Sequence, residues 1–285
     1  MVTKGISINL SYSKRVFFNT LSRVVSECEA QVSQMQSTFV LFINAAIFIG
    51  QCSSFSDYCD KSLCGNKKHI ACNVPKTFAP ACGKNPKKVP MDKNRKTMIL
   101  EMHNQFRNST AGGMNGFPQA ARMPTLLWDD ELENLSWYNA KKCKMEHDGC
   151  RNTKEFRSSG QNLATASYIG TDFDPDRWTK FFVKYWIDEY KHFPKSIVDK
   201  YPDSYRGPVI GHLTQIINDR TWKIGCSIVR YNPTSDTGTV VYIVCNYSMT
   251  NMIGEPVYTK GKSASKCKTG RNPRYTNLCS VKERV

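Results

Sequence analysis

The sequence predicts an α+β fold in which helices pack on a mostly antiparallel sheet. Apolar residues recur at helical spacing between residues 92 and 189, and the pattern changes to a period of two between residues 222 and 247. Helices followed by a hairpin are typical of this class. The 285 residues include twelve cysteines, too many for an ordinary cytosolic enzyme of this size, so the chain is expected to carry disulfides or bound metal.

The composition is that of a globular protein. Hydrophobic residues make up 40% of the chain and charged residues 22%, which excludes disorder throughout, collagen and coiled coils. The net charge of +16 makes the protein clearly basic.

Residues 1–54 are expected to be a leader that contains a signal peptide. The run 39–49 is apolar over eleven residues, whereas a membrane-spanning helix needs about 20. Small and polar residues follow the run, as in a signal-peptide cleavage region. The segment before the run is long for a signal peptide, so two alternatives stay open: translation starts at Met35, or the first residues are an unusual leader.

Ten cysteines follow the leader, an even number as a secreted disulfide framework requires. No pair has the C-x-x-C spacing, and no series of cysteines and histidines has the spacing of a zinc finger. The cysteines from Cys59 to Cys82 lie in a polar segment with little core of its own. We therefore expect residues 55–90 to be a cysteine-rich extension and not an independent domain.

A folded domain is expected over residues 91–258, and capping residues predict its first two helices. Asp92 precedes a stretch with apolar residues at helical spacing, which Gly112 and the glycines after it end. Asp129 precedes a second helix. The residues expected on one face of that helix are Leu132, Leu135 and Cys143.

Asp174 and Pro175 predict the start of a third helix, as a cap followed by proline at the first helical position. Its buried face is expected to comprise Trp178, Phe182 and Tyr185, and Glu189 lies three turns beyond the tryptophan on the same face. A buried carboxylate is costly unless it is paired or used. The pattern leaves two alternatives open: Glu189 has a function, or it lies at a frayed helix end in water.

Residues 222–231 and 239–247 are predicted to form the two strands of a β-hairpin, because the segment between them consists mainly of turn-forming residues. Cys226 and Cys245 are equidistant from the centre of the turn. Residues opposite one another in a hairpin meet the Cα distance that a disulfide requires, so we expect these two cysteines to be bonded.

The C-terminal segment 259–285 is expected to be a basic tail with one disulfide. It holds eight lysines and arginines against one acidic residue, Glu283, and Cys267 and Cys279 are its only cysteines. A solvated basic surface is the simplest interpretation. A heparin-like glycan or an anionic membrane surface is the partner that such a segment would bind. No nucleic-acid recognition motif is present, and we expect no nucleic-acid partner.

Six short motifs carry a family resemblance. In chain order they are 103–107 (HNQFR), 143–150 (CKMEHDGC), 160–164 (GQNLA), 186–189 (WIDE), 211–215 (GHLTQ) and 245–247 (CNY). Together they resemble the CAP superfamily of cysteine-rich secretory, antigen 5 and pathogenesis-related proteins. The early cysteines, with Cys59 and Cys64 first, are similar to the insect antigen 5 branch, the venom-allergen-like proteins. The resemblance covers about residues 57–258 and implies the CAP α-β-α sandwich.

The resemblance also implies disulfide connectivity and a cleft. The implied pairs are Cys59–Cys72, Cys64–Cys150, Cys82–Cys143 and Cys226–Cys245, which leaves Cys267 with Cys279. The implied cleft is lined by His147, Gln161, Glu189 and His212. Two histidines that converge with a carboxylate could hold a divalent metal, such as Zn²⁺, weakly.

The motifs also depart from the family pattern. Gln161 stands where many relatives have Glu, which removes a charge from the cleft. Asn218 stands where the Gly-His motif usually ends in Trp, and the Pro and Gly that usually follow Cys-Asn-Tyr are missing from residues 248–251.

The resemblance therefore predicts a secreted, extracellular and monomeric antigen 5-like protein, of the kind that includes allergens. We expect it to bind a small lipid or sterol, a metal ion, or a host or tissue partner, without catalysis and without a required cofactor. The alternative is a metal-assisted hydrolase that uses the cleft, but the motifs supply no set of nucleophile and base. A channel-directed toxin is the weakest reading, because two cysteines are too few for the cysteine-rich domain that such relatives carry.

Overall fold

The computed structural model describes residues 57–234 and 238–285. The chain divides into two units, Met1–Phe55 and Ser56–Val285. The expected leader, with its apolar run at 39–49 and the start at Met35, lies outside the described residues. No helix within the described part is both long enough and apolar enough to span a membrane.

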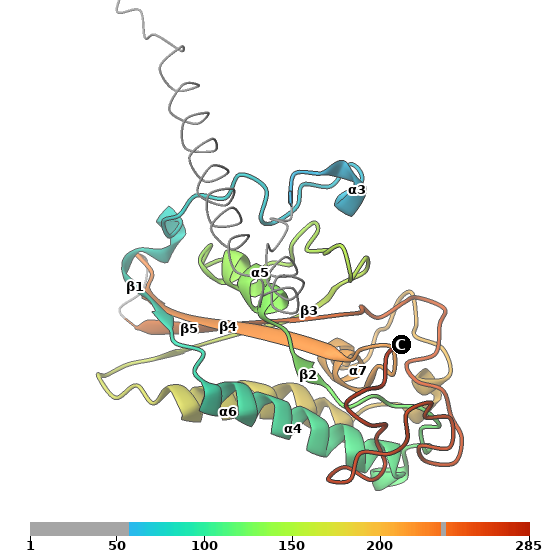
Figure 1. Ribbon diagram of the computed structural model, residues 1–285. Helices are drawn as coiled ribbons and strands as arrows, with labels where there is room; N and C mark the ends of the chain where they lie inside the picture. Colours follow the sequence, from blue (N-terminus) through green and yellow to red (C-terminus); the bar gives the residue numbers. More distant parts are fainter. Residues whose placement is uncertain (1–56, 235–237) are drawn as a thin grey trace, which may run out of the picture. The chain divides into compact units, whose positions relative to one another are not determined.

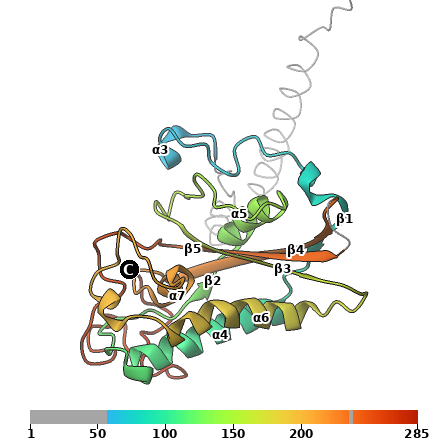
Figure 2. The same ribbon diagram turned by 180° about the vertical axis from the view of Figure 1, so that it is seen from behind.

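A mostly antiparallel sheet forms the centre of the second unit, as predicted (Figure 1, Figure 2). The hairpin of β4 (Lys223–Asn232) and β5 (Thr239–Tyr247) lies in the middle. Strand β3 (Gly160–Tyr168) pairs antiparallel with β5, and β1 (Lys84–Val89) pairs antiparallel with β4. The short strand β2 (Leu127–Trp128) joins β4 in parallel.

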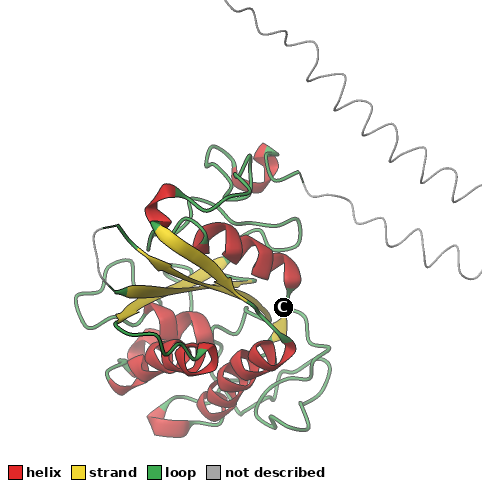
Figure 3. Ribbon diagram, turned by 90° about the vertical axis from the view of Figure 1, so that its left-hand side faces the viewer, coloured by secondary structure: helices red, strands yellow, loops and turns green. Residues whose placement is uncertain are grey.

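Helices cover both faces of the sheet, so the fold is an α-β-α sandwich (Figure 3). Helices α4 (Lys93–Ala111) and α6 (Pro175–Ile187) lie on one face, with α7 (Gly211–Ile217) beside them. Helix α5 (Asp130–Ala140) lies on the other. The shorter helices are α3 (Lys61–Cys64), η1 (Pro80–Cys82), η2 (Met114–Gly116), η3 (Asp188–Lys191) and η4 (Lys195–Val198).

The three predicted helix caps are confirmed. The side chains of Asp92, Asp129 and Asp174 each accept a hydrogen bond from a backbone N–H of the first turn, at 2.9, 2.9 and 3.0 Å. These aspartates satisfy N–H groups that the helix itself cannot pair. Pro175 opens α6, where its missing N–H costs nothing.

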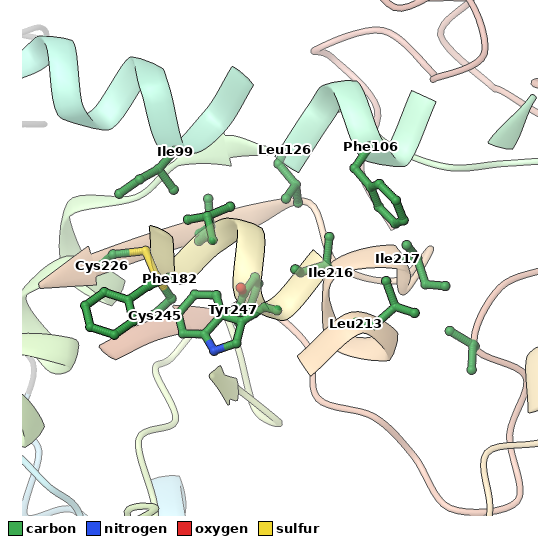
Figure 4. Packing of buried hydrophobic residues seen from close by; sticks show 14 of the residues in the cluster. Ile99, Phe106, Leu126, Phe182, Leu213, Ile216, Ile217, Cys226, Cys245 and Tyr247 are labelled. Carbon is green, nitrogen blue, oxygen red and sulfur yellow. A yellow bond between two sulfur atoms is a disulfide. The ribbon is translucent and has the colours of Figure 1, made fainter. Parts of the chain in front are cut away.

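The hairpin is buried on both faces, and apolar residues occupy the middle of β5 on both sides. Val241, Ile243 and Cys245 of β5 pack in the cluster beneath α4, α6 and α7 (Figure 4). Tyr242 and Val244 alternate with them and pack in the cluster under α5. Successive residues from Val241 to Cys245 therefore contribute in turn to two different cores, as the period of two requires.

Two predicted helix faces need correction. Tyr185 is 58% exposed, because the inward face of α6 is set by Phe182, Val183 and Trp186. Cys143 does not lie on α5, which ends at Ala140; it lies in the turn beyond, with a positive φ of 52°.

The segment boundaries also differ from those expected. Strand β1 pairs with β4, so the folded domain begins before the boundary predicted at residue 90. The segment 259–285 is not a detached tail. Its Tyr275 and Leu278 join the main core, and its backbone forms bridges from Lys260 to Ala120 and from Cys279 to Pro124. Burial of these two apolar side chains holds the basic segment on the domain.

The five disulfides are those expected. The hairpin register places Cys226 opposite Cys245, with Cα atoms 4.0 Å apart. The remaining bonds are Cys59–Cys72, Cys64–Cys150, Cys82–Cys143 and Cys267–Cys279. The first three fasten the N-terminal extension to itself and to the segment after α5.

Candidate functional site

The four predicted cleft residues come from four separate elements. His147 lies in the loop after α5, Gln161 is the second residue of β3, Glu189 lies in η3, and His212 lies in the first turn of α7. They form two pairs: His147 contacts Gln161, and His212 contacts Glu189. The alternative of a frayed, solvent-exposed Glu189 is wrong, because this residue is only 6% exposed.

Gln161 fixes the orientation and the tautomer of His147. Its Oε1 atom accepts from the backbone N–H of Asp148 at 3.4 Å, and its Nε2 atom donates to Asp148 Oδ2 at 2.7 Å and to Asn246 Oδ1 at 3.0 Å. The amide oxygen thus faces the His147 Nδ1 atom, at 2.9 Å. An amide oxygen only accepts, so Nδ1 carries the proton, and the lone pair of the neutral ring is on Nε2.

Glu189 orients His212 in the same sense. The His212 Nδ1 atom lies 2.6 Å from Glu189 Oε1, and Glu189 Oε2 accepts from the backbone N–H of Leu213 at 2.9 Å. The Trp186 ring stacks on the imidazole with ring centroids 5.8 Å apart. The His212 Nδ1–H group therefore donates to the Glu189 carboxylate, and the lone pair of the neutral ring is again on Nε2.

The two imidazoles influence each other electrostatically. Burial lowers the pKa of His147. The hydrogen bond that His147 donates to Gln161 and the charge of Asp148 oppose this shift, and the charges of Arg151 and His212 add to it. Neither histidine Nε2 atom has a hydrogen-bond partner among the described residues. Nε2 is therefore the atom through which each ring, in its neutral form, would bind a metal.

Each carboxylate oxygen of Glu189 has one partner, His212 Nδ1 for Oε1 and the Leu213 backbone N–H for Oε2. Within residues 57–234 and 238–285, the one group of three potential ligand atoms within 4.8 Å of one another is Cys64, His69 and Cys150. The two sulfurs of that group form a disulfide, so they offer no thiolate.

Sequence reasoning did not single out Asp148 and Asn246, although both lie inside the quoted motifs. Asp148 accepts from Gln161 Nε2 and from Asn139 Nδ2, the latter at 2.7 Å, and Asn246 is fully buried. Their role comes from the pairing of β3 with β5, which places Gln161 opposite Asn246. No spacing in the sequence shows this contact.

A disulfide-stabilised α-β-α sandwich defines the class of protein. The profile of the cysteine-rich secretory protein family (CAP) matches residues 100–247. Venom allergen-1 of Aedes albopictus is 55% identical over 245 residues, which cover 86% of this chain and 94% of the relative. Venom allergen 5 of Vespa velutina is 36% identical, over 72% of this chain and 100% of the relative. The chain belongs to the CAP family and to its antigen 5 branch.

A solved structure described as "Crystal structure of NaASP2 with Zn2+" has a TM-score of 0.53 and 28% identity to this chain. The likeness covers 66% of this chain and 96% of that one. The α-β-α sandwich implied by the motifs is thereby confirmed.

Proposed function

We propose that this antigen 5-like protein is a secreted, non-enzymatic binding protein whose cleft holds a divalent cation such as Zn²⁺ through His147 and His212. One observation carries the proposal: each imidazole has its Nδ1 atom occupied by a neighbouring acceptor, which leaves both Nε2 atoms for a ligand. Support also comes from the Zn²⁺ named for the CAP protein NaASP2.

Weak, reversible binding follows from the donor set. A structural zinc site uses four protein ligands, whereas this cleft offers two nitrogens, and water would complete the coordination. Gln161 adds no charge, and Glu189 acts through His212 as an orienting partner. Removal of such an orienting partner usually lowers metal affinity by about 10- to 100-fold.

The hydrolase alternative is less favoured by the geometry. A metal-assisted hydrolase needs a base within reach of the attacking water. The carboxylate at hand, Glu189, already accepts from Leu213 N–H and from His212. Secretion is supported by the five disulfides and by the relatives named venom allergens.

The test is calorimetry of Zn²⁺ binding to the oxidised protein at pH 7.5 and pH 5. Binding requires neutral imidazole, so the affinity for Zn²⁺ should decrease as the pH is lowered. Because burial lowers the pKa of His147, this decrease should occur below about pH 6.5, the usual pKa of histidine. Replacement of either histidine by Ala should abolish binding, and Glu189→Gln should weaken it about 10-fold or more.

His192→Ala is the matched control, because this histidine contacts the Val209 carbonyl outside the cleft. Equal affinity at both pH values, or binding that survives both His147→Ala and His212→Ala, would show that the cleft is not the metal site. Binding of a small lipid or sterol stays a prediction of the family resemblance.

A further inference from the structure

A cavity of about 620 Å³ lies between the N-terminal extension and the end of α5, and its lining includes neither His147 nor His212. The residues that line it come from 67–80 and from the segment 138–149. The volume is within the range of sites that hold small organic molecules, about 300 to 1,000 Å³. Apolar side chains supply one part of the wall, among them Ile70, Val74, Phe78 and Tyr138.

Covalent bonds and backbone contacts hold the walls in place. The disulfides Cys64–Cys150 and Cys82–Cys143 join the extension to the segment after α5 on either side of the cavity. Ile70 N–H donates to Cys150 O at 2.9 Å, and Ala79 N–H donates to Lys141 O at 3.0 Å. The cavity is therefore preformed, which lowers the entropy cost of binding.

The cavity wall holds a buried cation. Lys141 is only 5% exposed, and no described carboxylate lies within ion-pair distance of its ammonium group. The Nζ atom donates to the carbonyl of Pro75 and lies 4.8 Å from the centre of the Tyr138 ring. Burial lowers the pKa of Lys141. An ammonium has three donors, and the Pro75 carbonyl uses one of them.

Other charges around the cavity leave it positive. Lys67 and Lys68 line it as exposed residues and have no ion-pair partner among the described residues. Lys142 is paired with Glu146 at 3.2 Å. The acid in the wall, Asp148, is already engaged by Asn139, Gln161 and Arg151. An anion would thus meet unpaired ammonium groups.

We propose that this cavity is a binding site for a small amphipathic anion, with its acidic group at Lys141 and its apolar body against Val74, Phe78 and Tyr138. A carboxylate, sulfonate or phosphate would supply the missing counter-charge. The apolar wall would desolvate the rest of the molecule. The groups proposed to contact the anion, Lys141, Val74, Phe78 and Tyr138, have no role in the proposed metal site.

The first experiment compares two dyes of the same shape by fluorescence titration of the oxidised protein. Anilinonaphthalene sulfonate carries an acidic group, and N-phenyl-1-naphthylamine is its neutral counterpart. Removal of a charged hydrogen bond weakens binding by on the order of tenfold, so the anionic dye should bind at least that much more tightly. Equal affinity for the two dyes overturns the proposal without any variant.

The second experiment locates the site with Lys141→Met, which removes the charge and keeps most of the apolar stem. Affinity for the anionic dye should fall about tenfold, whereas affinity for the neutral dye should change less than about twofold, which also shows that the cavity is still folded. Lys141→Arg should retain the preference for the anion. The matched control, Lys142→Met, removes a cation that Glu146 already neutralises and should have little effect.

Two further controls separate this site from other surfaces. Phe181→Ser alters an exposed aromatic residue of α6 and should leave dye binding unchanged. Saturating Zn²⁺ or His147→Ala should also leave it unchanged, so this proposal and the metal proposal fail independently. Loss of the anionic dye in Phe181→Ser, or its full retention in Lys141→Met, overturns the assignment.

Discussion

At the scale of single residues, the amide of Gln161 is specific for its surroundings. It donates to a carboxylate, Asp148, and to the Asn246 amide oxygen, and it accepts from a backbone N–H. A glutamate at this position would replace the donating amide nitrogen by a carboxylate oxygen, which would face the oxygens of Asp148 and Asn246. The residue that departs from the common family pattern therefore suits a site in which the acid is supplied by Asp148.

Gln161→Glu should lower the free energy of unfolding at pH 7 by about 1 to 3 kcal/mol, because two buried acceptors lose their donor. The neighbouring Asp148 carboxylate should raise the pKa of the introduced carboxyl in the folded state. Stability is then regained as the pH falls and that carboxyl becomes protonated. Urea unfolding at pH 7 and pH 5 measures the difference.

Gln161→Met is the control for this experiment. It loses the same hydrogen bonds without adding a titrating group, so its deficit relative to the parent protein should be the same at both pH values. If the deficit of Gln161→Glu is equally insensitive to pH, the proposed repulsion with Asp148 is absent.

At the scale of elements, the C-terminal segment is held by its one acidic residue. Glu283 is 1% exposed and accepts from Arg122 Nε at 2.6 Å and from the backbone N–H groups of Lys268 and Thr269. Burial alone would raise the pKa of Glu283, but the hydrogen bonds from Thr269, Arg122 and Lys268 hold it at about 2. A segment that sequence alone presents as a basic tail thus has a buried anionic anchor.

Glu283→Gln should reduce the stability of this segment by about 2 kcal/mol at neutral pH. The folded-state pKa lies below the unfolded value, so the stabilisation is present above about pH 4.5 and is lost as the pH falls towards 2. Hydrogen exchange of residues 260–285 at several pH values measures it, and the difference between variant and parent should vanish near pH 2.

The matched control is Glu255→Gln, which removes a 59% exposed carboxylate lying 4.0 Å from Arg220. Exposed pairs of this kind contribute little. A protection loss in Glu255→Gln as large as that in Glu283→Gln would contradict the anchoring role. The expected contact of this segment with an anionic glycan or membrane stays a prediction.

At the scale of the whole molecule, the disulfides differ in accessibility. Cys226 and Cys245 are fully buried in the core, whereas Cys59 is exposed in the polar extension. Attack by a thiolate requires access to a sulfur. The extension, with few apolar side chains of its own, depends more on its cross-links than the sandwich does.

Graded reduction should therefore open Cys59–Cys72 first and Cys226–Cys245 last, and the extension should unfold before the sandwich. Alkylation of the freed thiols at increasing reductant, followed by peptide mass analysis, gives the order. Early alkylation of Cys226 or Cys245 while far-UV circular dichroism is unchanged would be incompatible with this order.

Because the cavity beside Lys141 is framed by Cys64–Cys150 and Cys82–Cys143, reduction should abolish dye binding in the cavity before it abolishes Zn²⁺ binding by His147 and His212.

Local patterns in the sequence were sufficient for much of the fold. The three aspartate caps, the hairpin and the Cys226–Cys245 bond were predictable because each depends on residues close in sequence or on a symmetric register. Helix faces were less predictable. The exposure of Tyr185 depends on how α6 is rotated against the sheet, and the helix has apolar residues on more than one face.

The sequence by itself determined the class of fold and the oxidised cysteines, and its motifs predicted four residues of a cleft. Only the tertiary structure decided how these four are paired and that Glu189 acts through His212. It also decided that the C-terminal segment belongs to the domain and that Lys141 lies buried without a counter-charge. The physical reason is that burial and charge pairing are set by contacts between residues far apart in sequence, whereas caps, turns and hairpin register are set by neighbours.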